Sequence, residues 1–314
     1  MKKYHSWLAG LLAAQIVLAG VLFFYKEQSM PQASNEPLLS FESAAIDKLV
    51  IADAENTVTL QKSGDQWRLP DLHELPVVDQ KVPELLDKLQ AVQVRWPVAT
   101  TTSSHERFEV GEKKFQRKLQ LFNGDKKVGE VLLGTSPGFR KVHARRPDDS
   151  EVYAVNLNSF DMPAAPLEWL DKTLLGAKDL QKIKGPDYEL QKAGEEWILA
   201  GTAKEADGGE DQVTVDAEKA QELANALTNL RIINVAEQQP QGEPVVITVG
   251  AAGGELQYEF LKQDDNYFVK RSDQSQAFTL SQFDYDRITQ IRQPQLAVKV
   301  EEQKENTEEK ESKG

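Results

Sequence analysis

The chain has 314 residues, is acidic and contains no cysteine. Its 37 lysines and arginines stand against 50 aspartates and glutamates, and the formal net charge of −13 argues against general nucleic-acid binding, which uses a basic face. The missing thiols exclude disulfides, thiolate catalysis, Cys-ligated zinc, iron–sulfur clusters and a lipid-modified cysteine. A hydrophobic content of 40% is enough for the core of one large domain or two smaller ones.

The N-terminus is predicted to anchor the chain in a membrane. Residues 7–25 carry no charge, and roughly 20 apolar residues suffice to cross a bilayer as a helix. Trp7 and Tyr25 stand where aromatic interface residues are expected, and the basic start at Lys2 and Lys3 predicts a cytoplasmic N-terminus. A cleaved signal peptide is the alternative, but the apolar run is long and no small-residue cleavage site follows it directly. We therefore predict residues 1–27 as a single-pass anchor in a bacterial inner membrane, with a periplasmic body.

A hairpin pattern occurs twice, 130 residues apart. Residues 60–69 and 190–199 each contain alternating apolar residues, a glycine–acidic turn and a Trp-x-Leu return strand. We expect Trp67 and Trp197 to pack in the core rather than to stack on a ligand, because they occupy the same place in both hairpins.

Each hairpin is followed by one amphipathic helix and further strands. Asp79 fits the N-cap of the first helix. The apolar positions of the two helices have helical spacing; they are Val82, Leu85, Leu86, Leu89 and Val92 in the first and Ala220, Leu223, Leu227, Leu230 and Ile232 in the second. Thr100 to Ser104 is expected to be a loop.

The fold class predicted from these patterns is α+β, with a transmembrane helix followed by two related units of mostly antiparallel strands, each with one main helix. A linker spans residues 28–40, the first unit spans 41–165, and a connector together with the second unit spans 166–296. The Glu/Lys-rich tail, residues 297–314, is expected to be disordered. The sequence leaves open whether the units are separate lobes or share one sheet, and it gives no oligomeric state.

No local pattern for catalysis, cofactor binding or metal binding occurs. None of the four histidines has a second ligand at metal-binding spacing, and the common nucleophile and phosphate-loop motifs are missing. We therefore predict no catalytic, cofactor-binding or metal-binding residues and no enzymatic activity. An uncharacterised hydrolase stays as an alternative, because distant residues can assemble a site.

One basic cluster stands out in the acidic sequence. Arg140, Lys141, His143, Arg145 and Arg146 lie within seven residues, after a Gly134–Gly138 loop. Such a strand can bind a phosphate, a carboxylate or an acidic partner. The alternative, which the sequence favours, is a solvated strand whose charges protect a sheet edge.

The anchor, the paired Gly-acidic-x-Trp hairpins, the helices after Asp79 and Asp216, and the Gly134 loop with its Val152-Tyr153 strand together resemble a bacterial family called domain of unknown function 4340. The resemblance extends from Ile46 to about Leu296. Members of this family are single-pass proteins often encoded beside ABC-type export systems linked to gliding motility. The resemblance implies an accessory or scaffold role beside ABC-type transporter subunits, and it carries over no catalytic residue.

Three functions are thus compared. The first is the periplasmic accessory or scaffold protein. The second is an extracytoplasmic module that binds an anionic envelope ligand, a glycan or a lipid head group, through Arg140, Lys141 and Arg145. The third is the hydrolase.

Overall fold

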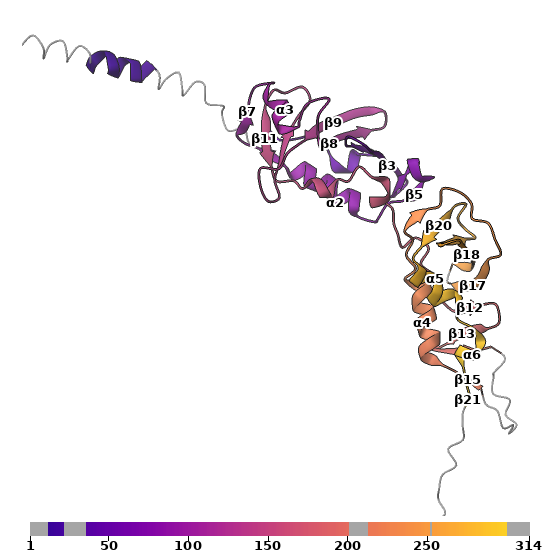
Figure 1. Ribbon diagram of the computed structural model, residues 1–314. Helices are drawn as coiled ribbons and strands as arrows, with labels where there is room; N and C mark the ends of the chain where they lie inside the picture. Colours follow the sequence, from indigo (N-terminus) through magenta and orange to yellow (C-terminus); the bar gives the residue numbers. More distant parts are fainter. Residues whose placement is uncertain (1–11, 22–35, 201–212, 252, 300–314) are drawn as a thin grey trace, which may run out of the picture. The chain divides into compact units, whose positions relative to one another are not determined.

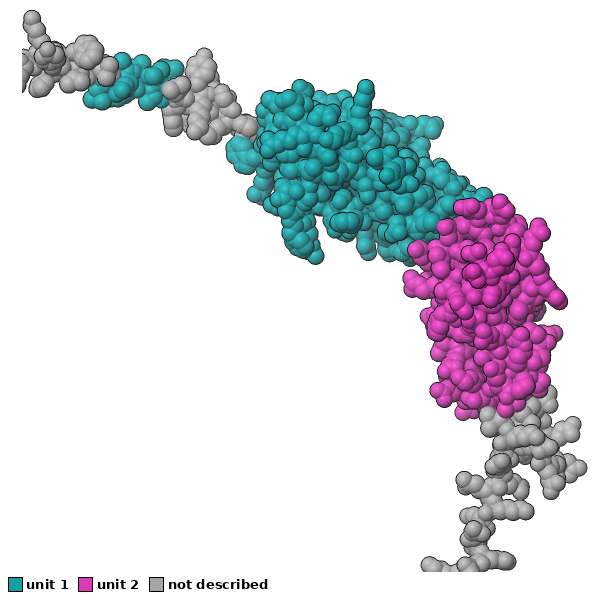
Figure 2. All heavy atoms as spheres, in the orientation of Figure 1, with its two compact units in different colours: residues 1–170 teal, residues 171–314 magenta. Residues whose placement is uncertain are grey.

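The computed structural model describes residues 12–21, 36–200, 213–251 and 253–299. The chain forms two compact units, residues 1–170 and 171–314, coloured teal and magenta in Figure 2. Most of the predicted anchor and linker, and the predicted tail from residue 300 on, lie outside the described residues. Residues 12–21 are helical, and within the described ranges no helix has the length and apolar character that crossing a membrane requires. Residues 297–299, the start of the predicted disordered tail, instead form a paired strand, and the other finer domain bounds stay a prediction.

Unit 1 is built on one nine-stranded sheet in which every pairing is antiparallel (Figure 1). In sheet order the strands are β5 (Leu75–Pro76), β4 (Gln66–Leu69), β3 (Thr57–Ser63), β2 (Lys48–Ala52), β8 (Arg117–Asn123), β9 (Lys126–Leu133), β10 (Val142–Arg145), β11 (Val152–Val155) and β7 (Pro97–Ala99). A separate two-stranded ladder joins β1 (Glu36–Pro37) to β6 (Gln93–Val94). Short 3-10 turns cover 43–45, 70–72, 159–161 and 166–168.

Helix α2 (Lys81–Ala91) supplies the second layer of the unit 1 core. The predicted stripe from Val82 to Val92 is buried at all five positions, which confirms the helical spacing. The predicted N-cap is wrong, because the helix begins after Gln80 (φ 62°), and Asp79 accepts a hydrogen bond from the Gln80 amide instead. The region expected to be a loop after Thr100 ends in a short helix, α3 (Ser104–Phe108).

Unit 2 has an eight-stranded antiparallel sheet. Its strands in order are β14 (Glu196–Leu199), β13 (Glu189–Ala193), β12 (Lys182–Lys184), β17 (Val245–Ala251), β18 (Gly254–Gln263), β19 (Asn266–Arg271), β20 (Ala277–Leu280) and β16 (Asn234–Val235). The remaining elements are β15 (Val213–Val215) paired with β21 (Ala297–Lys299), and the helices α4 (Ala217–Thr228), α5 (Gln282–Thr289) and α6 (Gln293–Leu296). Asp216 caps α4, since its carboxylate accepts from the Lys219 amide at 3.1 Å.

The two predicted hairpins form and have the same geometry. Gly64 (φ 61°) and Gly194 (φ 68°) each occupy the left-handed position of a two-residue turn, which glycine adopts without strain. Trp67 and Trp197 are buried, as predicted. The two large sheets share no described strand, which answers the question that the sequence left open. Strand-rich antiparallel sheets with few helices confirm the α+β class.

Candidate functional site

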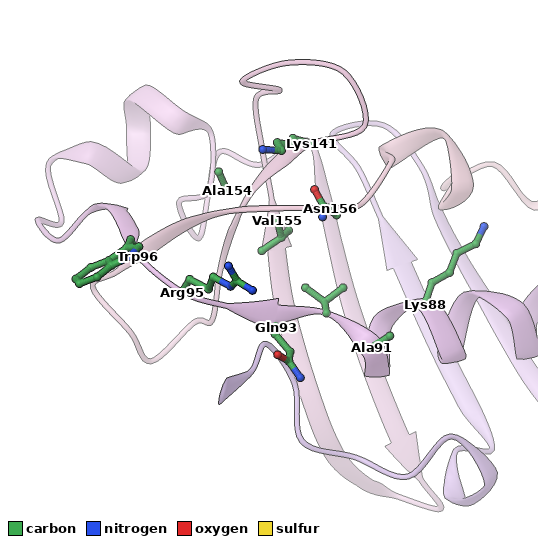
Figure 3. Close-up of a pocket in the computed structure, with 10 residues that line it drawn as sticks. Lys88, Ala91, Gln93, Arg95, Trp96, Lys141, Ala154, Val155 and Asn156 are labelled. Atoms are coloured by element: carbon green, nitrogen blue, oxygen red, sulfur yellow. The ribbon is translucent and has the colours of Figure 1, made fainter. Parts of the chain in front are cut away.

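The candidate site is an open groove at the C-terminal end of α2 in unit 1. Two adjoining pockets, of about 690 Å³ and about 570 Å³, share Lys88 and Asn156, and we call them together the basic groove. Figure 3 shows Lys88 and Trp96 at opposite ends of the larger pocket, with Arg95 and Lys141 between them. The groove is lined by Lys88, Ala91, Val92, Gln93, Arg95, Trp96, Arg140, Lys141, Ala154, Val155, Asn156, Leu157, Asn158 and Asp161.

The segment that leaves α2 forms one wall of the groove. Val92 and Val94 are buried, while the alternate residues Gln93 and Arg95 are exposed. This period of two follows from the extended backbone, whose side chains point to opposite faces. The buried valines therefore fix the segment to the core and direct the Arg95 guanidinium outward.

The loop before β10 forms the opposite wall. Gly134 starts the loop against α3, where a Cβ atom would lie 1.9 Å from the Phe108 carbonyl oxygen, so only glycine fits. The Thr135 amide then donates to that carbonyl at 2.9 Å. These contacts fix the base of the loop on unit 1.

A tight turn at the tip of this loop presents two groove residues. The Lys141 amide donates to the Gly138 carbonyl at 3.2 Å, and the Ser136 hydroxyl lies 2.7 Å from the Lys141 carbonyl as a donor. Arg140 has φ 53°, a left-handed conformation that costs a non-glycine residue roughly 1–2 kcal/mol. The strained turn leaves Phe139 87% exposed, with the Arg140 guanidinium 5.0 Å from its ring centroid.

The charge of the groove is opposite to that of the chain. Of the charged lining residues that the structure describes, four are cationic and only Asp161 is acidic, and Asp161 pairs with Lys88 at 3.0 Å. The other cations are Arg95, Arg140 and Lys141. Cations that converge on an open pocket attract phosphate and carboxylate groups, and the arginine forks can bind them in a bidentate manner. The arrangement can therefore hold an anion.

Exposed aromatic residues surround these cations. Trp96 is 54% exposed, Phe139 is 87% exposed, and Phe160 is 86% exposed in the turn whose neighbours Asn158 and Asp161 line the smaller pocket. Large aromatic side chains are usually buried in the core or in an interface. Trp96 thus lines the groove itself, and Phe139 and Phe160 adjoin residues that line it.

The structure separates the five residues of the predicted basic cluster. Arg140 and Lys141 line the groove, whereas His143 and Arg145 belong to β10 and are buried. The predicted strand from Arg140 to Arg146 is shorter, and β10 lies between β9 and β11 inside the sheet. The interpretation as a solvated edge strand is therefore wrong.

Arg145 is occupied by hydrogen bonds within unit 1. Its guanidinium donates to the carbonyls of Val110 (2.7 Å), Pro147 (2.7 Å) and Asp149 (3.1 Å), and to the Glu112 carboxylate (3.0 Å). A buried arginine needs such partners, because burying an unpaired charge strongly destabilises the folded state. Arg145 therefore organises the β10–β11 turn.

His143 and Arg146 are also engaged locally. The His143 ring lies 4.3 Å from the Phe108 ring, and its Nδ1 is 2.9 Å from the Thr135 hydroxyl. Burial lowers the pKa of His143, which favours the neutral imidazole. Arg146 pairs with Asp149 and lines another pocket of about 720 Å³, whose described charged lining residues are three acids and three bases.

Two groove cations, Lys88 and Arg95, were missed by the sequence analysis. Lys88 lies on the polar face of a helix, where a lysine is unremarkable. Arg95 follows Val92 and Val94, which the sequence spacing predicts to continue the apolar helical stripe. The backbone changes from helical to extended after Ala91, and this change directs Arg95 into the groove. Neither residue is near the Arg140 cluster in the sequence.

Among the described residues, no group of three or more histidines, aspartates or glutamates is placed to hold a metal ion. Comparison with family models gives one finding: residues 67–249, more than half of the chain, match "Domain of unknown function (DUF4340)". The chain belongs to the DUF4340 family. The DUF4340 match begins in β4 and ends in β17, so it includes every residue of the basic groove. No curated protein and no solved structure matches the chain.

Proposed function

We propose that this DUF4340 protein is a membrane-anchored, extracytoplasmic binding protein that holds an anionic group in the basic groove, as an accessory of an ABC-type transport system. The observation that carries the proposal is the set of four cations facing one acid on a protein of net charge −13. A cluster of positive charge is not expected by chance on the surface of an acidic protein. Such a cluster therefore supports the proposal that the surface binds an anion. We propose a binding role without catalysis by the chain itself.

The membrane anchor is part of this proposal. It rests on the uncharged residues 7–25, the preceding Lys2 and Lys3, and the flanking Trp7 and Tyr25. The proposed location is a bacterial inner membrane, with the two units on the periplasmic side. Retention of the full-length chain in membranes washed with alkaline carbonate would support the anchor, and release would contradict it.

The duplicated architecture is also proposed as the basis of a scaffold role. The order β4-β3-β2-β8-β9-β10-β11-β7 in unit 1 parallels β14-β13-β12-β17-β18-β19-β20-β16 in unit 2, and both units carry the same tryptophan hairpin. We infer that the units are copies of one ancestral unit. Two copies on one anchor would give a transport complex two surfaces to bind. The link to ABC-type systems rests on the family resemblance.

Binding of tripolyphosphate, a soluble polyanion, tests the groove itself. We compare detergent-solubilised full-length protein with the double variant Arg95→Gln/Lys141→Gln by titration calorimetry at low salt. The expected result is a loss of affinity of about tenfold or more, since each charge-assisted contact contributes roughly 1.5–3 kcal/mol where it is direct. The matched control is Lys113→Gln/Lys126→Gln, which removes two exposed cations of unit 1 outside the groove. Equal affinities for the two double variants would contradict the site.

Photo-crosslinking in native membranes tests the accessory role. Benzoylphenylalanine replaces Ile233, an exposed apolar residue of unit 2 outside the groove, or, as the control, the exposed Gln191 of the same unit. We expect ABC-type transporter subunits to crosslink to the probe at position 233 and not at position 191. Recovery of transporter subunits with neither probe would contradict the role.

A further inference from the structure

We infer that the basic groove and its aromatic rim, formed by Trp96, Phe139 and Phe160, dock on the surface of the membrane that carries the anchor, with anionic lipid head groups bound by Lys88, Arg95, Arg140 and Lys141. The inference deepens the proposed function and rests on it, because it names the source of the anion. The occupant is a bilayer surface, not a soluble ligand.

The chemistry of the rim distinguishes a bilayer from a soluble anion. A soluble anion would contact the cations and leave Trp96, Phe139 and Phe160 in water. Interfacial membrane segments combine lysine and arginine on anionic head groups with aromatic side chains that enter the boundary between head groups and acyl chains. Phe139 is well placed for that boundary, because it stands 87% exposed at the tip of a turn beside Arg140 and Lys141.

The path of the chain brings the groove close to the proposed anchor. The body of unit 1 begins at β1, where Pro37 pairs with Gln93 and Glu36 pairs with Val94. The next two residues, Arg95 and Trp96, line the groove. Residues 26–35 separate the end of the proposed span from β1, and a chain of that length reaches at most roughly 35 Å when fully extended. The groove is therefore tethered within a short distance of the bilayer.

Tethering makes weak lipid contacts effective. A short linker raises the effective concentration of the second binding site into the millimolar range, so each head-group contact need not be strong. Each cation near an anionic leaflet contributes attraction that falls off within a Debye length. The groove would thus bind when the leaflet is anionic and release when it is not.

A single fluorescent label tests this inference, and the cysteine-free chain makes the labelling specific. Full-length protein carrying Phe139→Cys is labelled with the environment-sensitive dye NBD and placed in nanodiscs of phosphatidylcholine, alone or in an equal mixture with phosphatidylglycerol. The control, Asp125→Cys, labels the exposed β8–β9 turn of the same unit. We expect a blue shift and quenching by spin-labelled lipid for the label at 139 only, and only in anionic discs.

Charge removal gives the second arm of the test. In the labelled chain, Arg95→Gln/Lys141→Gln should reduce the lipid quenching several-fold, while Lys113→Gln/Lys126→Gln should leave it unchanged. A label at 139 that stays in water in both kinds of disc overturns the inference. If the label at 139 stays in water and the groove also crosslinks to a transporter subunit, the surface binds an acidic protein partner instead.

The failure of the inference and the failure of the proposed function give different results. Loss of the full-length chain from the discs in high salt would contradict the anchor. A retained chain with tripolyphosphate affinity but no lipid quenching would contradict only the docking. Unchanged tripolyphosphate affinity in the Arg95→Gln/Lys141→Gln variant would contradict the anion site itself.

Discussion

The same strand connection differs between the two units. In unit 1 the eight residues between β9 and β10 carry the exposed Phe139–Arg140 turn, whereas in unit 2 only Asp264 and Asp265 separate β18 from β19. The position after the helix differs as well: the sequence repeat aligns the groove residue Arg95 with the exposed Ile233. At these two matching positions, unit 1 has basic and aromatic residues, whereas unit 2 has acidic or apolar residues.

The buried cores of the two units are alike, whereas their surface connections differ. The buried hairpin residues and helix stripes occur in both units, because each sheet needs an apolar face to pack against. Three of the four groove cations, Arg95, Arg140 and Lys141, lie in connections between elements, and surface loops vary most freely. The proposed anion binding therefore belongs to unit 1, and the matching end of unit 2 is left for the proposed scaffold contacts.

The largest effects are expected where the units agree. Leu60 and Leu190 are fully buried at matching hairpin positions, and Leu→Ala at either should lower the free energy of unfolding by about 4 kcal/mol. The controls Gln61→Ala and Gln191→Ala change exposed neighbours and should have little effect. Urea unfolding monitored by circular dichroism measures the change. If the free energy of unfolding falls by less than about 1 kcal/mol at either leucine, the two hairpins do not contribute equally to their cores.

A buried arginine ends the same strand in both units. Arg145 ends β10 and pairs with Glu112, while Arg271 ends β19 and pairs with Asp273 at 2.6 Å. Arg145→Ala should cost about 3 kcal/mol, because several carbonyls lose their donor. Arg145→Lys should not restore stability, since an ammonium cannot reproduce the fork geometry. Unchanged stability with reduced tripolyphosphate binding would instead assign Arg145 to the ligand.

An ion cluster on β9 gives a pH-dependent contribution to the stability of unit 1. Burial alone would raise the pKa of Glu130, but hydrogen bonds from Lys127, Gln120 and Lys118 lower it to about 2. Because the pKa of Glu130 is lower in the folded state, its ionised carboxylate stabilises the fold at pH values above 4.5, the ordinary pKa of a glutamate. This stabilisation is lost as the pH falls toward about 2. Glu130→Gln should therefore cost about 2 kcal/mol at pH 7 and progressively less below pH 4.5. A cost independent of pH between 7 and 3 would contradict this explanation.

The smallest expected effect separates stability from binding. Arg140 (φ 53°) and Asp264 (φ 54°) are both left-handed in corresponding connections. Glycine at either site removes strain, so Arg140→Gly and Asp264→Gly should each raise stability by up to about 1 kcal/mol. Only Arg140→Gly should weaken tripolyphosphate binding, as titration calorimetry can show. Weaker binding in both variants would remove the distinction between the units.

The sequence predicts the periodic parts of this protein well. The Gly64 and Gly194 turns, both buried tryptophans and both helix stripes follow from local spacing, because short-range geometry sets them. The Asp79 cap is wrong, because the backbone turns left-handed at Gln80 and delays the helix. Only part of the groove is predictable: Arg140 and Lys141 were found as a charge cluster, but Lys88 and Arg95 join them through tertiary packing.

The basic groove is tested most directly by hydrogen exchange of the full-length protein in detergent, read by mass spectrometry with and without tripolyphosphate. The polyanion should slow exchange in residues 88–96 and 138–158 and leave the matching segments of unit 2, residues 226–234 and 262–281, unchanged. The Arg95→Gln/Lys141→Gln variant should lose this protection. Equal protection of both units, or protection that survives the double variant, would contradict the claim that the binding site of the chain is the basic groove of unit 1.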